Sequence, residues 1–182
     1  MTQYEIPARR PTVTESNIIS WIRNGYGFIA SYGAATATNP SLKMCAFSLF
    51  NPSNSGVSVI IYSIRINSGS SSVGSDNSVN ITTSDPTGTT GFTQTFSATN
   101  QGAGTTSSVV SLCATATGAT ANVTATGTTV DMFGSTSNAS TELLSNGAIF
   151  FLPNGVAKGI SIFEHVTTAG NVFGATVRWI EY

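Results

Sequence analysis

Residues 47–66, FSLFNPSNSGVSVIIYSIRI, consist of two apolar arms around the run NPSNSG. Every residue of this run favours turns over helix or strand, so the segment predicts a β-hairpin. The second arm is rich in β-branched residues, which favour strands. In strand alternation, Ile60, Tyr62, Ile64 and Ile66 share one face. That face is apolar throughout and predicts a core face.

The opposite face of the second arm has a mixed character. It carries Val57, Val59, Ile61, Ser63 and Arg65, apolar at its start and polar at its end. Another segment or another subunit is expected to cover the apolar half, because exposed apolar strand faces are unusual. We therefore predict an interface on the outer strand face at Val57, Val59 and Ile61.

Charge is scarce along the whole chain. Only 8% of the 182 residues are charged, against about 25% in an average soluble domain. Helices usually carry Glu, Lys, Arg and Gln outward, so a surface of Ser, Thr, Gly and Asn favours strands and loops. The net charge is -1 and the basic residues form no stripe, which argues against nucleic acid as a partner.

The sequence also bears on membranes and cysteines. No stretch is long and apolar enough for a transmembrane helix, and residues 1–17 lack the apolar region of a signal peptide. We therefore expect no membrane partner. Without export, Cys45 and Cys113 are expected to be buried thiols, with a disulfide between neighbouring strands as the alternative.

The first 17 residues contain two prolines and no clear apolar period. They predict an extended arm that lies against its own domain or against a neighbouring subunit. Interface contacts from this arm are predicted at Tyr4, Ile6, Arg9, Arg10 and Val13. The predicted organisation is an N-terminal arm with a possible short helix at residues 1–24, followed by a β-sandwich domain at residues 25–182.

Residues 16–23 fit two secondary structures. With Ser16 as N-cap, the isoleucines would form one face of a two-turn helix that Asn24 and Gly25 end. A strand is the alternative, because the segment is short and β-branched.

The remainder of the chain predicts short strands separated by turns. Turn signals lie at residues 85–88, 145–147 and 153–155, and residues 171–182 form a long alternating segment that places Trp179 inward. Roughly eight to ten strands of this kind predict an all-β fold, an antiparallel β-sandwich that is jelly-roll-like.

No catalytic set is recognisable in the sequence. The single histidine, His165, follows Glu164, and adjacent residues of a strand point to opposite faces. The eight acidic residues are dispersed, without the spacing of a metal or glycosidase site. We therefore expect no enzyme activity, no metal and no cofactor.

Three segments resemble small β-sandwich virion proteins of tailed bacteriophages. Residues 47–56, FSLFNPSNSG, resemble their "F-N-P-x-x-S-G" hairpin. Residues 149–155, IFFLPNG, resemble their "L-x-P-G-x-G-L" turn, although Asn154 replaces the first glycine and residues 156–158 lengthen the turn. Residues 177–182, VRWIEY, resemble their "v-x-W-x-E" terminus.

This resemblance implies a head-decoration, head-fibre or tail-associated structural protein. Such a protein would be part of the virion, assembled in the host cytoplasm. Its expected partners are copies of itself and a major capsid protein or another virion protein.

Two alternatives stay open. One is an extracellular filament subunit whose N-terminal arm donates a strand to the next subunit. The other is a carbohydrate-binding module in which Trp21, Tyr26, Tyr32 or Trp179 stacks on sugar rings. The second alternative requires exposed aromatic rings, whereas the alternation of the last strand predicts that Trp179 is buried.

Overall fold

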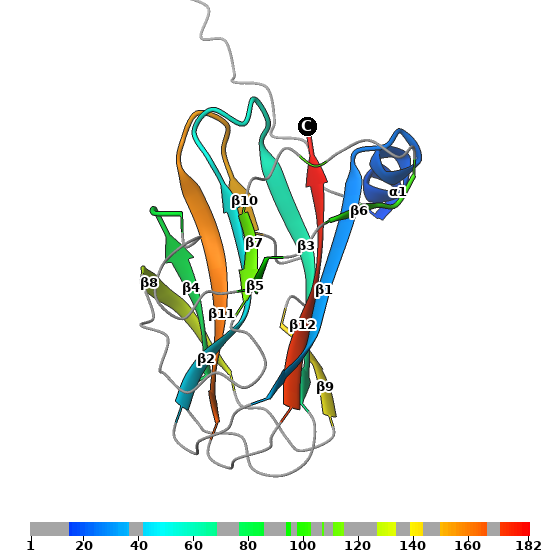
Figure 1. Cartoon of the computed structure of the whole chain (residues 1–182). Helices are drawn as coiled ribbons and strands as arrows, with labels where there is room; N and C mark the ends of the chain where they lie inside the picture. Colours follow the sequence, from blue (N-terminus) through cyan, green and yellow to red (C-terminus); the bar gives the residue numbers. More distant parts are fainter. Residues whose placement is uncertain are drawn as a thin grey trace, which may run out of the picture.

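Two antiparallel β-sheets pack face to face in the computed structural model of the chain, which confirms the predicted β-sandwich (Figure 1). One short helix accompanies them. The structure describes residues 15–36, 42–68, 77–85, 94–95, 98–102, 107, 111–114, 127–133, 139–143, 150–166 and 172–182.

The first sheet, sheet A, has the order β10-β3-β12-β1-β6, and β9 also pairs with β3. Its strands are β1 (Gly27–Thr36), β3 (Val59–Ser68), β6 (Thr99–Asn100), β9 (Ala139–Glu142), β10 (Phe150–Leu152) and β12 (Val172–Glu181). The second sheet, sheet B, has the order β5-β7-β2-β11-β4-β8. Its strands are β2 (Leu42–Asn51), β4 (Asn77–Thr82), β5 (Gln94–Thr95), β7 (Ser111–Ala114), β8 (Thr128–Phe133) and β11 (Lys158–Val166). The predicted β-hairpin at residues 47–66 is therefore wrong, because β2 and β3 belong to different sheets and the turn between them carries the chain from one sheet to the other.

The core lies between the two sheets and is built by alternate residues of the long strands. Phe47 and Ile162 of sheet B are fully buried. Val177 and Trp179 of sheet A are also fully buried. The Trp179 ring packs on Phe28 with 5.9 Å between ring centroids. Burying a side chain of this size stabilises a fold by about 1.5–3 kcal/mol. The expectation that Trp179 is buried is confirmed.

A β-bulge at Tyr62 changes the facing of β3. Ile61 lies opposite Trp179 and Ser63 lies opposite Arg178 in β12, so Tyr62 is one extra residue in its strand. Such an extra residue shifts the alternation by one position. As a result, odd-numbered residues of β3 point into the core before Tyr62, and even-numbered residues do so after it.

The predicted facing of β3 is therefore half wrong. Ile64 and Ile66 belong to the core, as expected, but so do Val59 and Ile61, all four with at most 1% exposure. Val59 and Ile61 were predicted on the outer face, because strict alternation does not anticipate a bulge. They are covered by the other sheet of their own chain, and no partner is needed to bury them.

Residues 15–23 form the helix α1 (Glu15–Arg23), so the helical alternative is the correct one. It begins one residue before the predicted cap, and Asn24 and Gly25 end it as predicted. Gly25 has a φ of 83°. The amides of Gly25 and Tyr26 bond the carbonyls of Ile22 and Trp21, both at 3.0 Å, which is the Schellman arrangement that favours glycine.

The two sheets differ in their outer faces. In sheet B, Phe50 and Phe163 point away from the core and are nevertheless buried. Ser48 and Ser161, which share a hydrogen bond of 2.9 Å, are buried as well. Residues of both faces of sheet B are therefore buried. In sheet A, outward residues such as Arg65 are exposed. The outer face of sheet A thus has exposed polar side chains, whereas the outward Phe50 and Phe163 of sheet B are covered.

The register keeps the two cysteines apart. Cys113 of β7 pairs with Ser48, three positions along β2 from Cys45. Three strand residues span about 10 Å, which exceeds the Cα separation of a disulfide. Cys45 is buried, in agreement with the expectation for that residue.

Candidate interaction surface

The outer face of sheet A changes from apolar to polar along its strands. Near α1, Phe151 of β10, Ile60 of β3 and Ile180 of β12 lie in one row across the sheet. Ile60 and Ile180 are buried, whereas Phe151 is 46% exposed. The next residue of this row, Gly27, lies under Ile22 of α1. The row therefore offers apolar contact area at its β10 edge.

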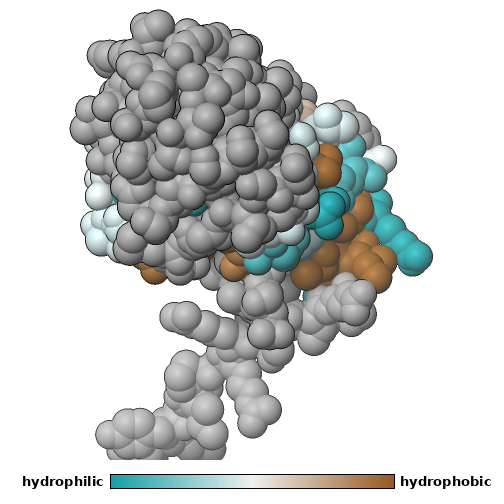
Figure 2. Space-filling model, turned by 90° about the horizontal axis from the view of Figure 1, so that it is seen from below, coloured by the Kyte–Doolittle hydropathy of each residue, from teal (hydrophilic) through white to brown (hydrophobic). Residues whose placement is uncertain are grey.

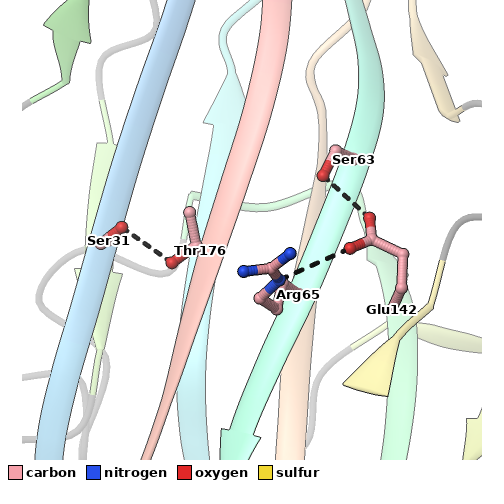
Figure 3. Close-up of polar contacts among 5 residues, drawn as sticks. All are labelled: Ser31, Ser63, Arg65, Glu142 and Thr176. Carbon is pink, nitrogen blue, oxygen red and sulfur yellow. Dashed lines mark hydrogen bonds and ion pairs between the residues drawn. The ribbon is translucent and has the colours of Figure 1, made fainter. Parts of the chain in front are cut away.

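Further along the strands the same face is polar, as Figure 3 shows. Ser31 of β1 and Thr176 of β12 share a hydrogen bond of 2.8 Å. Glu142 of β9 accepts a hydrogen bond of 2.8 Å from Ser63 and lies 3.7 Å from Nε of Arg65. Both side chains of this ion pair are well exposed, so it contributes little stability. In this half of the face, the polar side chains interact with one another.

Tyr62 and Arg178 lie between the apolar and polar halves. Burial raises the pKa of the Tyr62 phenol above its usual 10.0, while a hydrogen bond with Gln101 and the charge of Arg178 act in the opposite direction. The phenol is therefore neutral at physiological pH. The bulge that places Val59 and Ile61 in the core is the same feature that brings Tyr62 to this position.

Three segments that are distant in sequence meet beside this face. Ser58 exchanges two backbone hydrogen bonds with Tyr182, at 2.9 and 3.1 Å, and its hydroxyl accepts a bond of 3.1 Å from the amide of Asn154. Residues 52–58, residues 153–157 and the C-terminus thus form one end of the sandwich together with α1, at the top of Figure 1. We refer to this end as the helix end.

Most of the large apolar side chains that are exposed in the described part of the chain lie at the helix end. They are Ile19, Tyr26, Phe151, Val156 and Tyr182, each between 45% and 52% exposed. Val130 of β8 has a similar exposure, 45%, but lies at the edge of sheet B. In the view from below, brown hydrophobic residues and teal hydrophilic residues lie side by side at the right of the molecule (Figure 2). The helix end is therefore the best candidate for a contact surface.

Two aromatic rings join α1 to the C-terminus at the helix end. Trp21 and Tyr182 stack in parallel, with 6.0 Å between centroids and 4° between planes. Offset stacked rings at such distances stabilise by about 0.5–1.5 kcal/mol beyond their burial. The stack fixes the last residue of the chain against the helix, so the exposed part of Tyr182 is held in place.

The interior side of the helix end contains a buried acid. Glu181 is 4% exposed, and its Oε1 accepts hydrogen bonds from the indole of Trp179 at 2.9 Å and from the hydroxyl of Ser107. Its backbone amide also bonds the carbonyl of Tyr26. Glu181 is fixed by neighbours on every side, which indicates a structural role.

The predicted interface residues have different outcomes. Tyr4, Ile6, Arg9, Arg10 and Val13 lie outside the described residues. Val57 is half-buried at the helix end, where its carbonyl accepts bonds from Asn51 and Ser55. Val59 and Ile61 are core residues. The interface roles of the arm and of Val57 stay predictions.

The sequence did not single out Phe151 or Glu164. No facing was predicted for Phe151, because a three-residue strand such as β10 has too little alternation to show one. Glu164 is fully buried, and neither of its carboxyl oxygens has a hydrogen-bond partner. Its signal was present, since Ile160, Ile162 and Glu164 alternate in phase.

Among the described residues, no three His, Cys, Asp or Glu side chains come together as a metal site requires. α1, the helix of the described part, is too short to cross a membrane. No family model, no curated protein and no solved structure matches the chain.

Proposed function

We propose that this chain is a non-enzymatic structural protein of a virus particle, a capsid decoration or another head or tail surface component. It acts by associating with copies of itself and by docking on a lattice of another virion protein. The observation that carries the proposal is the gathering of exposed apolar side chains at the helix end. A contact surface of this kind combines apolar area with a polar rim.

The arrangement of the three resembling segments supports the virion setting. The turn at residues 52–58, which connects sheet B to sheet A, the turn at residues 153–157 and the C-terminal Tyr182 are hydrogen-bonded to one another through Ser58. The segments that resemble the phage proteins therefore build one continuous piece of surface. A shared surface is what a shared way of docking would preserve.

The outer face of sheet A supplies the polar rim of the proposed contact. Ser31, Thr176 and the pair of Arg65 with Glu142 continue from the apolar row toward the other end of the sheet. Polar groups at a rim fix orientation more than they add affinity. In this arrangement the helix end provides the area and the polar rows provide the register.

Electron microscopy of particles that contain the chain tests the proposal. The expected result is a repeated density, with the size of one β-sandwich per copy, on the surface of a head or tail. Density in a cell-surface fibre would favour the filament subunit instead. Absence of the chain from any purified particle would overturn the virion proposal.

A carbohydrate-binding module remains a second candidate because Tyr26 and Tyr182 expose their rings at the same end. Such rings can stack on sugars, although the stack with Trp21 already occupies one face of Tyr182. Calorimetric titration with soluble polysaccharides separates the candidates. Binding that is lost in Tyr26→Ala and in Tyr182→Ala favours the module, and no heat for any polysaccharide favours the structural protein.

A further inference from the structure

Glu164 stands apart from every other described acid of the chain. It lies in β11, a central strand of sheet B, and its side chain has 0% exposure. Glu181 is also buried, but it accepts two hydrogen bonds. Glu142 is exposed and paired. Both oxygens of Glu164 lack any hydrogen-bond partner, so nothing compensates a charge at this position.

The strand alternation directs Glu164 toward the core. Ile160 and Ile162 of β11 are core residues, and Glu164 follows in the same phase. On β2 it is opposite Met44, and on β4 the corresponding position is Asn77, next to the Ser78 that pairs with Phe163. Asn77 is also buried. The strand neighbours at this position are therefore uncharged.

Tyr32 of sheet A is the titratable side chain that the structure describes against the core from the facing sheet. Lys43 and His165 pair with each other in the backbone register one position further along β2 and β11. Among the residues whose side chains the structure describes, no positively charged one belongs to the core that Glu164 faces.

We propose that Glu164 is a pH-sensitive switch. The protonated side chain is accommodated inside the sandwich, whereas its ionisation weakens the pairing of β11 with the neighbouring strands near residue 164. A neutral carboxylic acid can be buried at moderate cost, whereas an unpaired buried carboxylate is strongly disfavoured. The ionised side chain would have to reach water, and separation of β11 from β2 or β4 near residue 164 would allow this. The inference does not depend on the proposed function.

The direction of the pH effect follows from burial. Loss of hydration raises the pKa of Glu164 from 4.5 to about 8. Between these values the folded chain keeps a proton that the unfolded chain releases, so folding stability falls as pH rises. The contribution is fully present below pH 4.5 and is lost once the pH exceeds about 8. Within this window the unfolding equilibrium constant rises up to about tenfold per pH unit.

Two measurements on the full chain test the switch. The first is a titration of the glutamate carboxyl carbons by ¹³C NMR, in which one resonance should titrate near pH 8 and be missing in Glu164→Gln. The second is urea unfolding from about pH 5 to about pH 9. The wild type should lose stability with rising pH, and Glu164→Gln should lose much less.

Glu142→Gln is the matched control, because it removes an exposed glutamate and should keep the pH slope of the wild type. If Glu164→Gln does not fold, Glu164→Met supplies the uncharged comparison, and the wild-type titration stands without any variant. The proposal is overturned if every glutamate titrates below about pH 5.5, or if the variants keep the wild-type slope.

Discussion

Ile22 of α1 lies directly against Gly27 of β1, where a Cβ would stand 2.5 Å from Ile22 Cγ1. Gly102 is closer still, since its Cβ would meet the carbonyl oxygen of Ile22. The helix rests on two positions that have no side chain. Through the stack of Trp21 on Tyr182, this contact also positions the C-terminus at the helix end.

Gly27→Ala is therefore expected to displace α1 and to destabilise the fold by about 1–3 kcal/mol. Urea unfolding measures the loss. The double variant with Ile22→Ala should lose less than the sum of the two single variants, because the clash is then relieved. Additive losses would mean that Ile22 and Gly27 are not in contact.

The core facing of β3 after the bulge predicts the effect of a charge there. Ile64→Asp should prevent folding, because it places an unpaired carboxylate at a fully buried position. Asn67→Asp is the control, since Asn67 is exposed on the same strand. Circular dichroism and solubility are the measurements. A soluble β-structured Ile64→Asp protein would contradict the assigned facing.

The hydrogen bond from Trp179 to Glu181 predicts a graded response. Glu181→Leu leaves the buried indole N–H without an acceptor and should cost about 1–3 kcal/mol. Glu181→Gln keeps a carbonyl acceptor at the same place and should cost less. Unfolding followed by tryptophan fluorescence compares the two variants. Equal losses would show that the acceptor does not matter.

The ion pair of Arg65 with Glu142 should contribute very little. The two side chains are 52% and 38% exposed and 3.7 Å apart, so solvent screens their attraction. A double-mutant cycle with Arg65→Ala and Glu142→Ala is expected to give a coupling of less than about 1 kcal/mol, which salt reduces further. A larger coupling that is insensitive to salt would contradict this assignment.

Local turn chemistry made much of the fold predictable from sequence. Asn24 and Gly25 end α1, and the run at residues 51–56 ends β2 in a turn, because these residues favour turns or positive φ. The same run did not reveal that the chain changes sheets there, so that β2 and β3 form no hairpin. The inward facing of Trp179 followed from alternation in a long regular strand. Such signals depend on neighbours in sequence, and for that reason they were visible.

Features that depend on neighbours in space were not predictable. The bulge at Tyr62 exists only relative to the register with β12, so alternation within β3 assigned Val59 and Ile61 to the wrong face. The helix end unites residues 52–58, residues 153–157 and Tyr182, which no sequence spacing connects. The candidate surface could therefore be recognised only in the folded chain.

The central claim, that the helix end mediates assembly, is tested most directly by sedimentation velocity of the purified chain over a range of concentrations. The double variant Phe151→Ser, Val156→Ser removes apolar area from the helix end, and Val130→Ser removes a valine of similar exposure elsewhere. The account predicts that the wild type and Val130→Ser sediment as oligomers and that the double variant dissociates. A monomeric wild type, or a double variant that assembles as well as Val130→Ser, would contradict it.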